Sequence, residues 1–184
     1  RDKAVSQGIE PVGHIVAMDG IAVIVHPSNQ VKELTTEQIK AIYAGKVSNW
    51  SQVGGPDKRI VVISRDTAGG TYEVFNNLVM DRAKVRPDAL LKASNQSVVM
   101  TVSRTPGAIG YVGLGYVTSK TEAVIVDGIV CTKETVVSGE YPLSRPLFMY
   151  TNGQPRGAVK DLLDFIKGKE GQKLVEEGGY VGLQ

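Results

Sequence analysis

One short segment of this sequence has the residue types and the spacing to bind an anion. Residues 65–71 read RDTAGGT and lie between a strand-like apolar run and a helical pattern. Gly69 and Gly70 carry no Cβ, so the backbone can approach an oxyanion there. Thr71 adds a hydroxyl donor, and Arg65 can bind two oxygens of a tetrahedral anion through its planar guanidinium. The first helical turn would add unbonded N–H groups and the positive end of the helix dipole.

The same segment also has a purely structural interpretation. Gly-Gly-Thr before a helix is a common loop and cap, and a nearby arginine is often a surface group. A Walker-type phosphate loop would need wider glycine spacing and a lysine after the second glycine, and the sequence has neither. Spacing alone therefore indicates an anion of phosphate size without establishing it.

Few other residues have the pattern of a catalytic or metal site. His14 and His26 lie outside any metal-spacing cluster, and no HExxH or GxSxG pattern occurs. Cys131 lies on an apolar strand, where a small buried hydrophobe is more common than a nucleophile. Trp50 and Tyr43 are expected to pack in the core. We therefore predict no enzyme activity, no metal and no cofactor.

Composition narrows the class of protein further. The chain has 184 residues, is 42% hydrophobic, and carries 21 basic against 19 acidic residues. The basic side chains are scattered, which argues against a nucleic-acid partner. With one cysteine the chain forms no internal disulfide, and its longest apolar run, 21–25, is far shorter than the roughly 20 residues of a membrane span. It opens abruptly in a polar stretch, so we expect a mature or truncated product.

The elements that must position segment 65–71 alternate between strand and helix. Apolar β-branched runs predict strands at 21–25, 60–63 and 147–150, and Gly-rich residues 108–117 predict another strand region. A hairpin is predicted at Asp127-Gly128, with arms at 124–126 and 129–131. Helices are predicted after Leu34, after residue 71, at 97–103, at 158–166 and at 170–177. This alternation is typical of an α/β fold.

Three local details of these helices are predicted. Thr35 and Gln38 match a capping box that begins the first helix. The helix after residue 71 should turn Val74, Phe75, Leu78 and Val79 inward. The amphipathic helix 158–166 should turn Val159, Leu162, Leu163 and Ile166 inward.

Several segments together resemble one known family. They are DGIAVIVHPSN, LTTEQIKAIYAGKVSNWSQVGG, IVVISRDTAGGTYEVF, PGAIGYVGLGYV and GEYPLSRPLFMYT. In this order they resemble the phosphate-binding proteins of bacterial phosphate ABC importers, over about residues 14–184. The resemblance implies an α/β fold of the type II periplasmic-binding-protein kind, with two lobes of mixed, mainly parallel sheets joined by a two-strand hinge.

The resemblance also assigns site residues. Arg65 matches the family's phosphate-binding arginine, while Gly70 and Thr71 match its backbone and hydroxyl donors. Gly69 stands where the family usually has a serine, so one hydroxyl donor is absent. Arg1 is similar to the last residue of a Ser-Arg segment near the ligand. These residues are the phosphate-binding residues that we expect.

The family pattern also indicates which residues form each of the two lobes. It begins with a signal peptide and further donor loops that precede the equivalent of Arg1, so we expect an N-terminally truncated chain. Residues 1–30 and 146–184 would form a partial first lobe, and residues 31–145 the second. Strands 21–25 and 147–150 would cross the hinge.

Selectivity for phosphate over sulfate requires an acceptor for the proton that phosphate retains near neutral pH. Asp66 is the nearest carboxylate to Arg65 in the sequence. Asp19, which precedes Gly20, is interpreted as a turn residue. The sequence does not decide which carboxylate is the acceptor.

We therefore expect a periplasmic or cell-surface protein, lipid-anchored in its full-length form, that binds inorganic phosphate and delivers it to an ABC permease. A separately supplied N-terminal segment is a further partner to test. One alternative is a phosphate-binding-like module in adhesion or signalling, without transport. The other, a phosphoesterase, lacks a candidate nucleophile and metal ligands.

Overall fold

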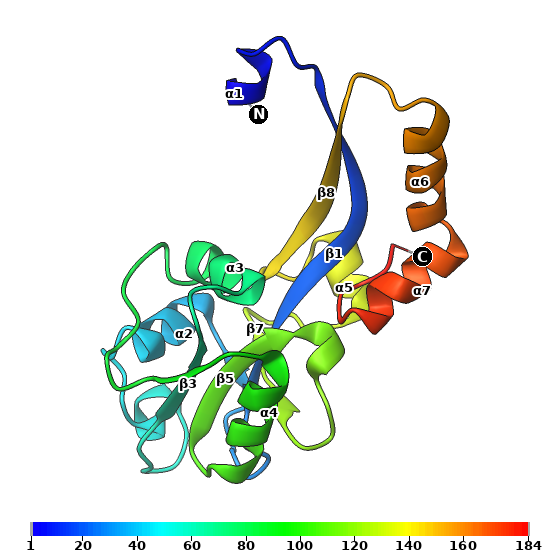
Figure 1. Cartoon of the computed structure of the whole chain (residues 1–184). Helices are drawn as coiled ribbons and strands as arrows, with labels where there is room; N and C mark the ends of the chain where they lie inside the picture. The colour runs from blue at the N-terminus through cyan, green and yellow to red at the C-terminus, as the bar shows by residue number, and fades with distance from the viewer. Residues whose placement is uncertain (1, 184) are drawn as a thin grey trace.

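The computed structural model describes residues 2–183 and is shown in Figure 1. Its strands are β1 (Pro11–Val25), β2 (Glu33–Leu34), β3 (Val61–Arg65), β4 (Leu90–Lys92), β5 (Ala108–Gly113), β6 (Glu122–Ala123), β7 (Ile125–Val126) and β8 (Ser144–Asn152). Its helices are α1 (Asp2–Val5), α2 (Thr36–Tyr43), α3 (Gly70–Leu78), α4 (Asn95–Arg104), α5 (Lys133–Ser138), α6 (Gly157–Lys167) and α7 (Lys169–Glu177), with short 3-10 turns at Trp50–Val53 and Leu114–Tyr116. The predicted alternation of strands and helices is confirmed.

The main sheet is mixed. Its order is β4-β3-β5-β1-β6, and β8 also pairs with β1. β3 runs parallel to β4 and β5, whereas β1 runs antiparallel to β5, β6 and β8. The carboxyl ends of β3 and β4 therefore lie at the same edge, and this edge carries the β3–α3 loop.

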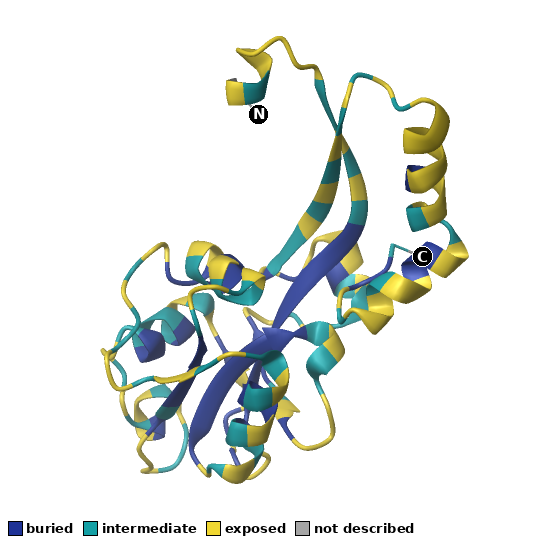
Figure 2. Cartoon of the chain, viewed as in Figure 1, coloured by how far each residue is buried: buried dark blue, intermediate teal, exposed yellow. Residues whose placement is uncertain are grey.

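β1 is the element that joins the parts of the molecule. The predicted strand 21–25 is only its last third, which pairs with β5 and β6 inside the sheet. Residues 11–20 pair with β8 in an antiparallel ribbon that extends beyond the sheet (Figure 1). Burial follows this division, because β1 is buried from Ala17 onward and only partly covered before it (Figure 2).

The predicted local signals for turns and caps are largely confirmed. Thr35 and Gln38 form the capping box of α2. Asp127 and Gly128 have φ angles of 50° and 79°, as a two-residue hairpin turn requires. The arm after this turn is reduced to a bridge between Val126 and Ile129, and β7 pairs in parallel with β2 instead.

Three predicted inward positions are wrong. Leu78 in α3 and Val159 and Leu162 in α6 are exposed, whereas Leu163 is buried. α6 contacts α7 and β1, and these two elements leave Val159 and Leu162 uncovered. Helical periodicity marks the apolar face of a helix, but it does not show how much of that face is covered. No helix within residues 2–183 is long and apolar enough to cross a membrane.

Candidate anion-binding site

The β3–α3 loop brings a strand end and a helix start together, as the sequence predicted. β3 ends at Arg65 and α3 begins at Gly70, with Gly69 in extended conformation at the N-cap. Gly69 gives this helix no side-chain cap. Among residues 2–183, no group accepts a hydrogen bond from the N–H of Gly69, Gly70 or Thr71. These three amides are free to bind an anion, and the helix dipole favours negative charge there.

Arg65 lies directly beneath this helix start. Its side chain is held by three hydrogen bonds, donated by Nε to the Lys92 carbonyl (3.2 Å), by Nη1 to Asn95 Oδ1 (2.8 Å) and by Nη2 to the Ala93 carbonyl (3.0 Å). The residue is only 8% exposed. A guanidinium has five N–H donors, so one remains on each Nη nitrogen. The β4–α4 connection therefore fixes Arg65 in place and leaves it two donors for a ligand.

The backbone beneath Arg65 is also fixed. The amide of Arg65 donates to the hydroxyl of Tyr111 at 3.2 Å, and that hydroxyl lies 3.0 Å from Ser64 Oγ. The Tyr111 ring stacks on Phe75 of α3, with ring centroids 3.8 Å apart. Burial raises the pKa of Tyr111, so its hydroxyl stays protonated at neutral pH. This contact couples the end of β3 to the helix that follows it.

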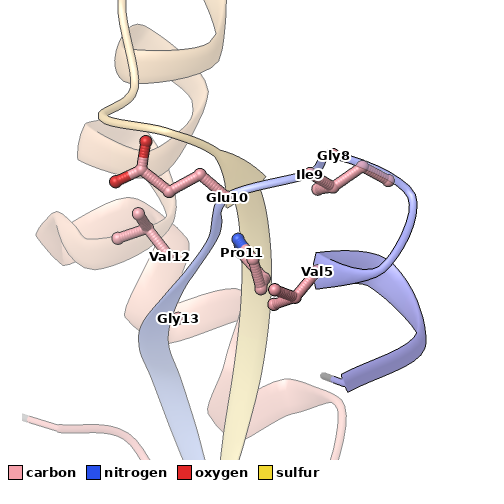
Figure 3. Close-up of a pocket in the computed structure, with 7 residues that line it drawn as sticks. All are labelled: Val5, Gly8, Ile9, Glu10, Pro11, Val12 and Gly13. Carbon is pink, nitrogen blue, oxygen red and sulfur yellow. The ribbon is translucent and has the colours of Figure 1, made fainter.

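Positive side chains surround the flank of Arg65. Arg65 and Thr67 line a hollow of about 310 Å³ that also receives Lys84 and Arg86. A larger hollow of about 500 Å³ lies elsewhere, along residues 5–13 (Figure 3). Its lining is mainly apolar and holds one carboxylate, Glu10, which points away from Val5. The hollow at Arg65 is thus lined by three basic side chains, of which Arg86 is paired with Asp88.

A second guanidinium reaches the same helix start, and the sequence did not assign it to the site. Arg145 lies on β8, and its Nη2 is 3.9 Å from the position that a Cβ on residue 70 would take. Its strand partner is Asp19 on β1, whose Oδ2 lies 3.7 Å from Arg145 Nε. The interpretation of Asp19 as a turn residue is wrong, because it lies inside a long strand and is buried. The β1–β8 register that creates this pair has no local signal in the sequence.

The structure also places other residues that the sequence analysis singled out. Trp50 is buried and donates to the Gly107 carbonyl at 2.9 Å, and His14 Nε2 lies 2.9 Å from Thr151 Oγ1. Asp66 is partly buried, and its Oδ1 is 3.8 Å from the Cβ position of Gly69. Arg1 lies outside the described residues. Within residues 2–183, no group of three His, Cys, Asp or Glu side chains is placed to hold a metal ion.

Comparison with known proteins identifies the class to which this fold and loop belong. The sequence model of a family described as "PBP superfamily domain" matches residues 2–170. The chain is also 34% identical to the phosphate-binding protein PstS of Bacillus subtilis over 172 residues, which is 92% of this chain. It spans 57% of the length of that relative.

Comparison with solved structures identifies the same class of protein. The chain is similar to a putative phosphate ABC transporter substrate-binding protein with bound phosphate from Clostridium perfringens, with 34% identity and a TM-score of 0.81. It is also similar to PstS from Borrelia burgdorferi, with 32% identity and a TM-score of 0.84. In both comparisons it is covered completely and spans 76% of the other chain. The chain belongs to the PBP superfamily and, within it, to the phosphate-binding proteins.

Proposed function

We propose that this protein binds inorganic phosphate at the start of α3 and delivers it to a membrane ABC permease for import. The observation that carries the proposal is the convergence of three unbonded amides, at residues 69–71, with the spare donors of Arg65. The names of the similar proteins support phosphate as the ligand and an ABC transporter as the assembly.

The proposed site residues are Arg65, Gly69, Gly70 and Thr71, with Arg1 as a further candidate. A tetrahedral anion would exchange its water shell for these fixed N–H and O–H donors, in a position that the helix dipole already favours. The proposed function consists of binding and releasing phosphate, which requires no nucleophile and no metal. The names of two relatives, a phosphate-binding protein and a putative phosphate ABC transporter substrate-binding protein, support a binding role.

The proposal includes a two-lobe arrangement and an extracytoplasmic location. Residues 31–145 would form one lobe, and residues 1–30 with 146–184 would belong to the other. The β1–β8 ribbon supports this division, because it leaves the sheet as an extended pair of strands (Figure 1). Phosphate would then bind where the ribbon meets α3.

Titration calorimetry with inorganic phosphate tests the proposal. We expect saturable binding that Arg65→Gln weakens roughly 10- to 100-fold, since a hydrogen bond to a charged group contributes about 1.5–3 kcal/mol. Thr71→Val is the second variant, because the Thr71 hydroxyl has no hydrogen-bond partner within residues 2–183 and its loss should not disturb the fold. Wild-type protein that takes up no phosphate would contradict the proposal and favour a module of adhesion or signalling.

The matched control is Arg104→Gln. Arg104 is exposed at the end of α4, whereas Asn95, which holds Arg65, begins that helix. Nine residues of helix separate the two ends by about 13 Å. The control removes the same charge as Arg65→Gln, so phosphate affinity should change little in it.

A further inference from the structure

The Asp19–Arg145 pair has an unusual geometry for a structural ion pair. The two residues face each other in the antiparallel register of β1 and β8, and Asp19 is only 5% exposed. Their charged groups nevertheless stay 3.7 Å apart at Arg145 Nε, beyond hydrogen-bond distance. Nε itself is buried and has no hydrogen-bond partner. No described residue donates a hydrogen bond to the Asp19 carboxylate.

This pair places a guanidinium at the site without using its donors. Leaving a buried donor or acceptor unbonded costs stability, and replacing such a pair by apolar groups is often favourable. The pair is therefore poorly explained by stability alone. Arg145 instead extends its Nη2 toward Gly70, whose Cβ position has no atom of Arg65 within 4 Å. Arg65 approaches the same turn at Gly69, where its Nη2 is 2.6 Å from the Cβ position.

We propose that Arg145 is a second anion-binding side chain of the α3 site and that Asp19 is the residue that positions it. This inference rests on the proposed function, because it concerns the same phosphate. The two guanidinia come from different parts of the fold, Arg65 from the parallel part of the sheet and Arg145 from the ribbon. An anion bound by both connects the ribbon to the sheet edge.

The charges of the three side chains suit a phosphate dianion. Two guanidinium groups and one carboxylate leave a net charge of +1 beside the free amides of α3. Asp19 attracts Arg145 electrostatically but bonds none of its N–H groups, so the fork stays available to the ligand. Burial raises the pKa of Asp19, and the charge of Arg145 opposes this shift. The charge of Arg145 therefore favours the ionised form of the Asp19 carboxylate, which lies 3.7 Å from it.

Phosphate titration of single and double variants tests the inference. Arg145→Gln should weaken phosphate binding at least tenfold, and Arg145→Lys should recover part of that loss because it keeps the charge without the fork. Asp19→Asn should also weaken binding, but only while Arg145 is present. In the Arg145→Gln background the same Asp19 change should leave affinity unaltered, which a merely structural role of Asp19 would not produce. Arg104→Gln again serves as the charge-matched control.

The outcomes separate this inference from the proposed function. Phosphate binding by the wild type that Arg65→Gln weakens and Arg145→Gln does not would overturn the role of Arg145 alone. Absence of binding in the wild type would overturn both. Thermal unfolding of each variant shows whether it is folded at the temperature of the titration. A lower melting temperature together with an unchanged dissociation constant would assign the pair a structural role and overturn the inference.

Discussion

The Nη2 atom of Arg65 lies 2.6 Å from the position that a Cβ on residue 69 would take, so the guanidinium occupies the space of that side chain. The close approach of Arg65 therefore explains why residue 69 is a glycine. Its backbone angles do not require glycine, because any residue can adopt a φ of −92°. The serine that the family resemblance suggests at this position would have to displace Arg65. Arginine and glycine at these two positions are therefore coupled in this chain.

Gly69→Ala should lower the free energy of unfolding by about 1–3 kcal/mol, the usual cost of overpacking a well-filled site. The new methyl group would push Arg65 from its bonds to Ala93 and Asn95. In an Arg65→Ala background the obstructing atom is gone, and only the smaller loss of a favourable N-cap residue should remain. Chemical denaturation of the four proteins measures this coupling. Equal costs in both backgrounds would contradict the steric explanation.

The sequence predicted those parts of the fold that depend on neighbouring residues. The α2 capping box, the Asp127-Gly128 turn and the strand-loop-helix around Arg65 are all set by contacts within a few residues, and all three are confirmed. The Asp19–Arg145 pair depends on the register of two strands more than 100 residues apart. No local pattern encodes that register, so sequence reasoning missed the second guanidinium.

Tyr111→Phe should destabilise the protein by about 1–3 kcal/mol, the cost of leaving a buried polar group unbonded. The variant keeps the ring that stacks on Phe75 but removes the hydroxyl that accepts the Arg65 amide. Urea denaturation should show a lower midpoint with an unchanged slope. Tyr116→Phe is the control, since the Tyr116 hydroxyl has no hydrogen bond within residues 2–183. Equal losses in both variants would exclude the proposed role of the hydroxyl.

Two adjacent leucines of α6 should respond very differently to the same change. Leu163 is 4% exposed and Leu162 is 50% exposed, although periodicity assigned both to the inner face. Leu163→Ala should cost about 2–5 kcal/mol through lost burial and the cavity that it leaves. Leu162→Ala should stay within about 0.5 kcal/mol, as surface substitutions usually do. Thermal or urea unfolding compares them directly, and similar costs would mean that another surface covers Leu162.

Cys131 should be unreactive in the folded protein near pH 8. Burial raises the pKa of its thiol to about 12, and the interaction of the thiol with the Tyr141 side chain opposes only part of this shift. Because the thiolate is the reactive form, a thiol-specific chromogenic disulfide should label Cys131 only after unfolding. Rapid labelling of the native protein at the rate seen in denaturant would show that the thiol is not buried.

The raised pKa of Cys131 also makes the stability of the folded protein depend on pH, in a direction that can be stated. The unfolded thiol loses its proton near its ordinary pKa of 9.0, whereas the folded thiol keeps it to about 12. Between these values the folded state binds more protons, so stability must fall as pH rises. Cys131→Ala has no such proton to lose. The difference in unfolding free energy between wild type and Cys131→Ala should therefore shrink from pH 8 to pH 10.5, and a difference independent of pH would place the thiol in water.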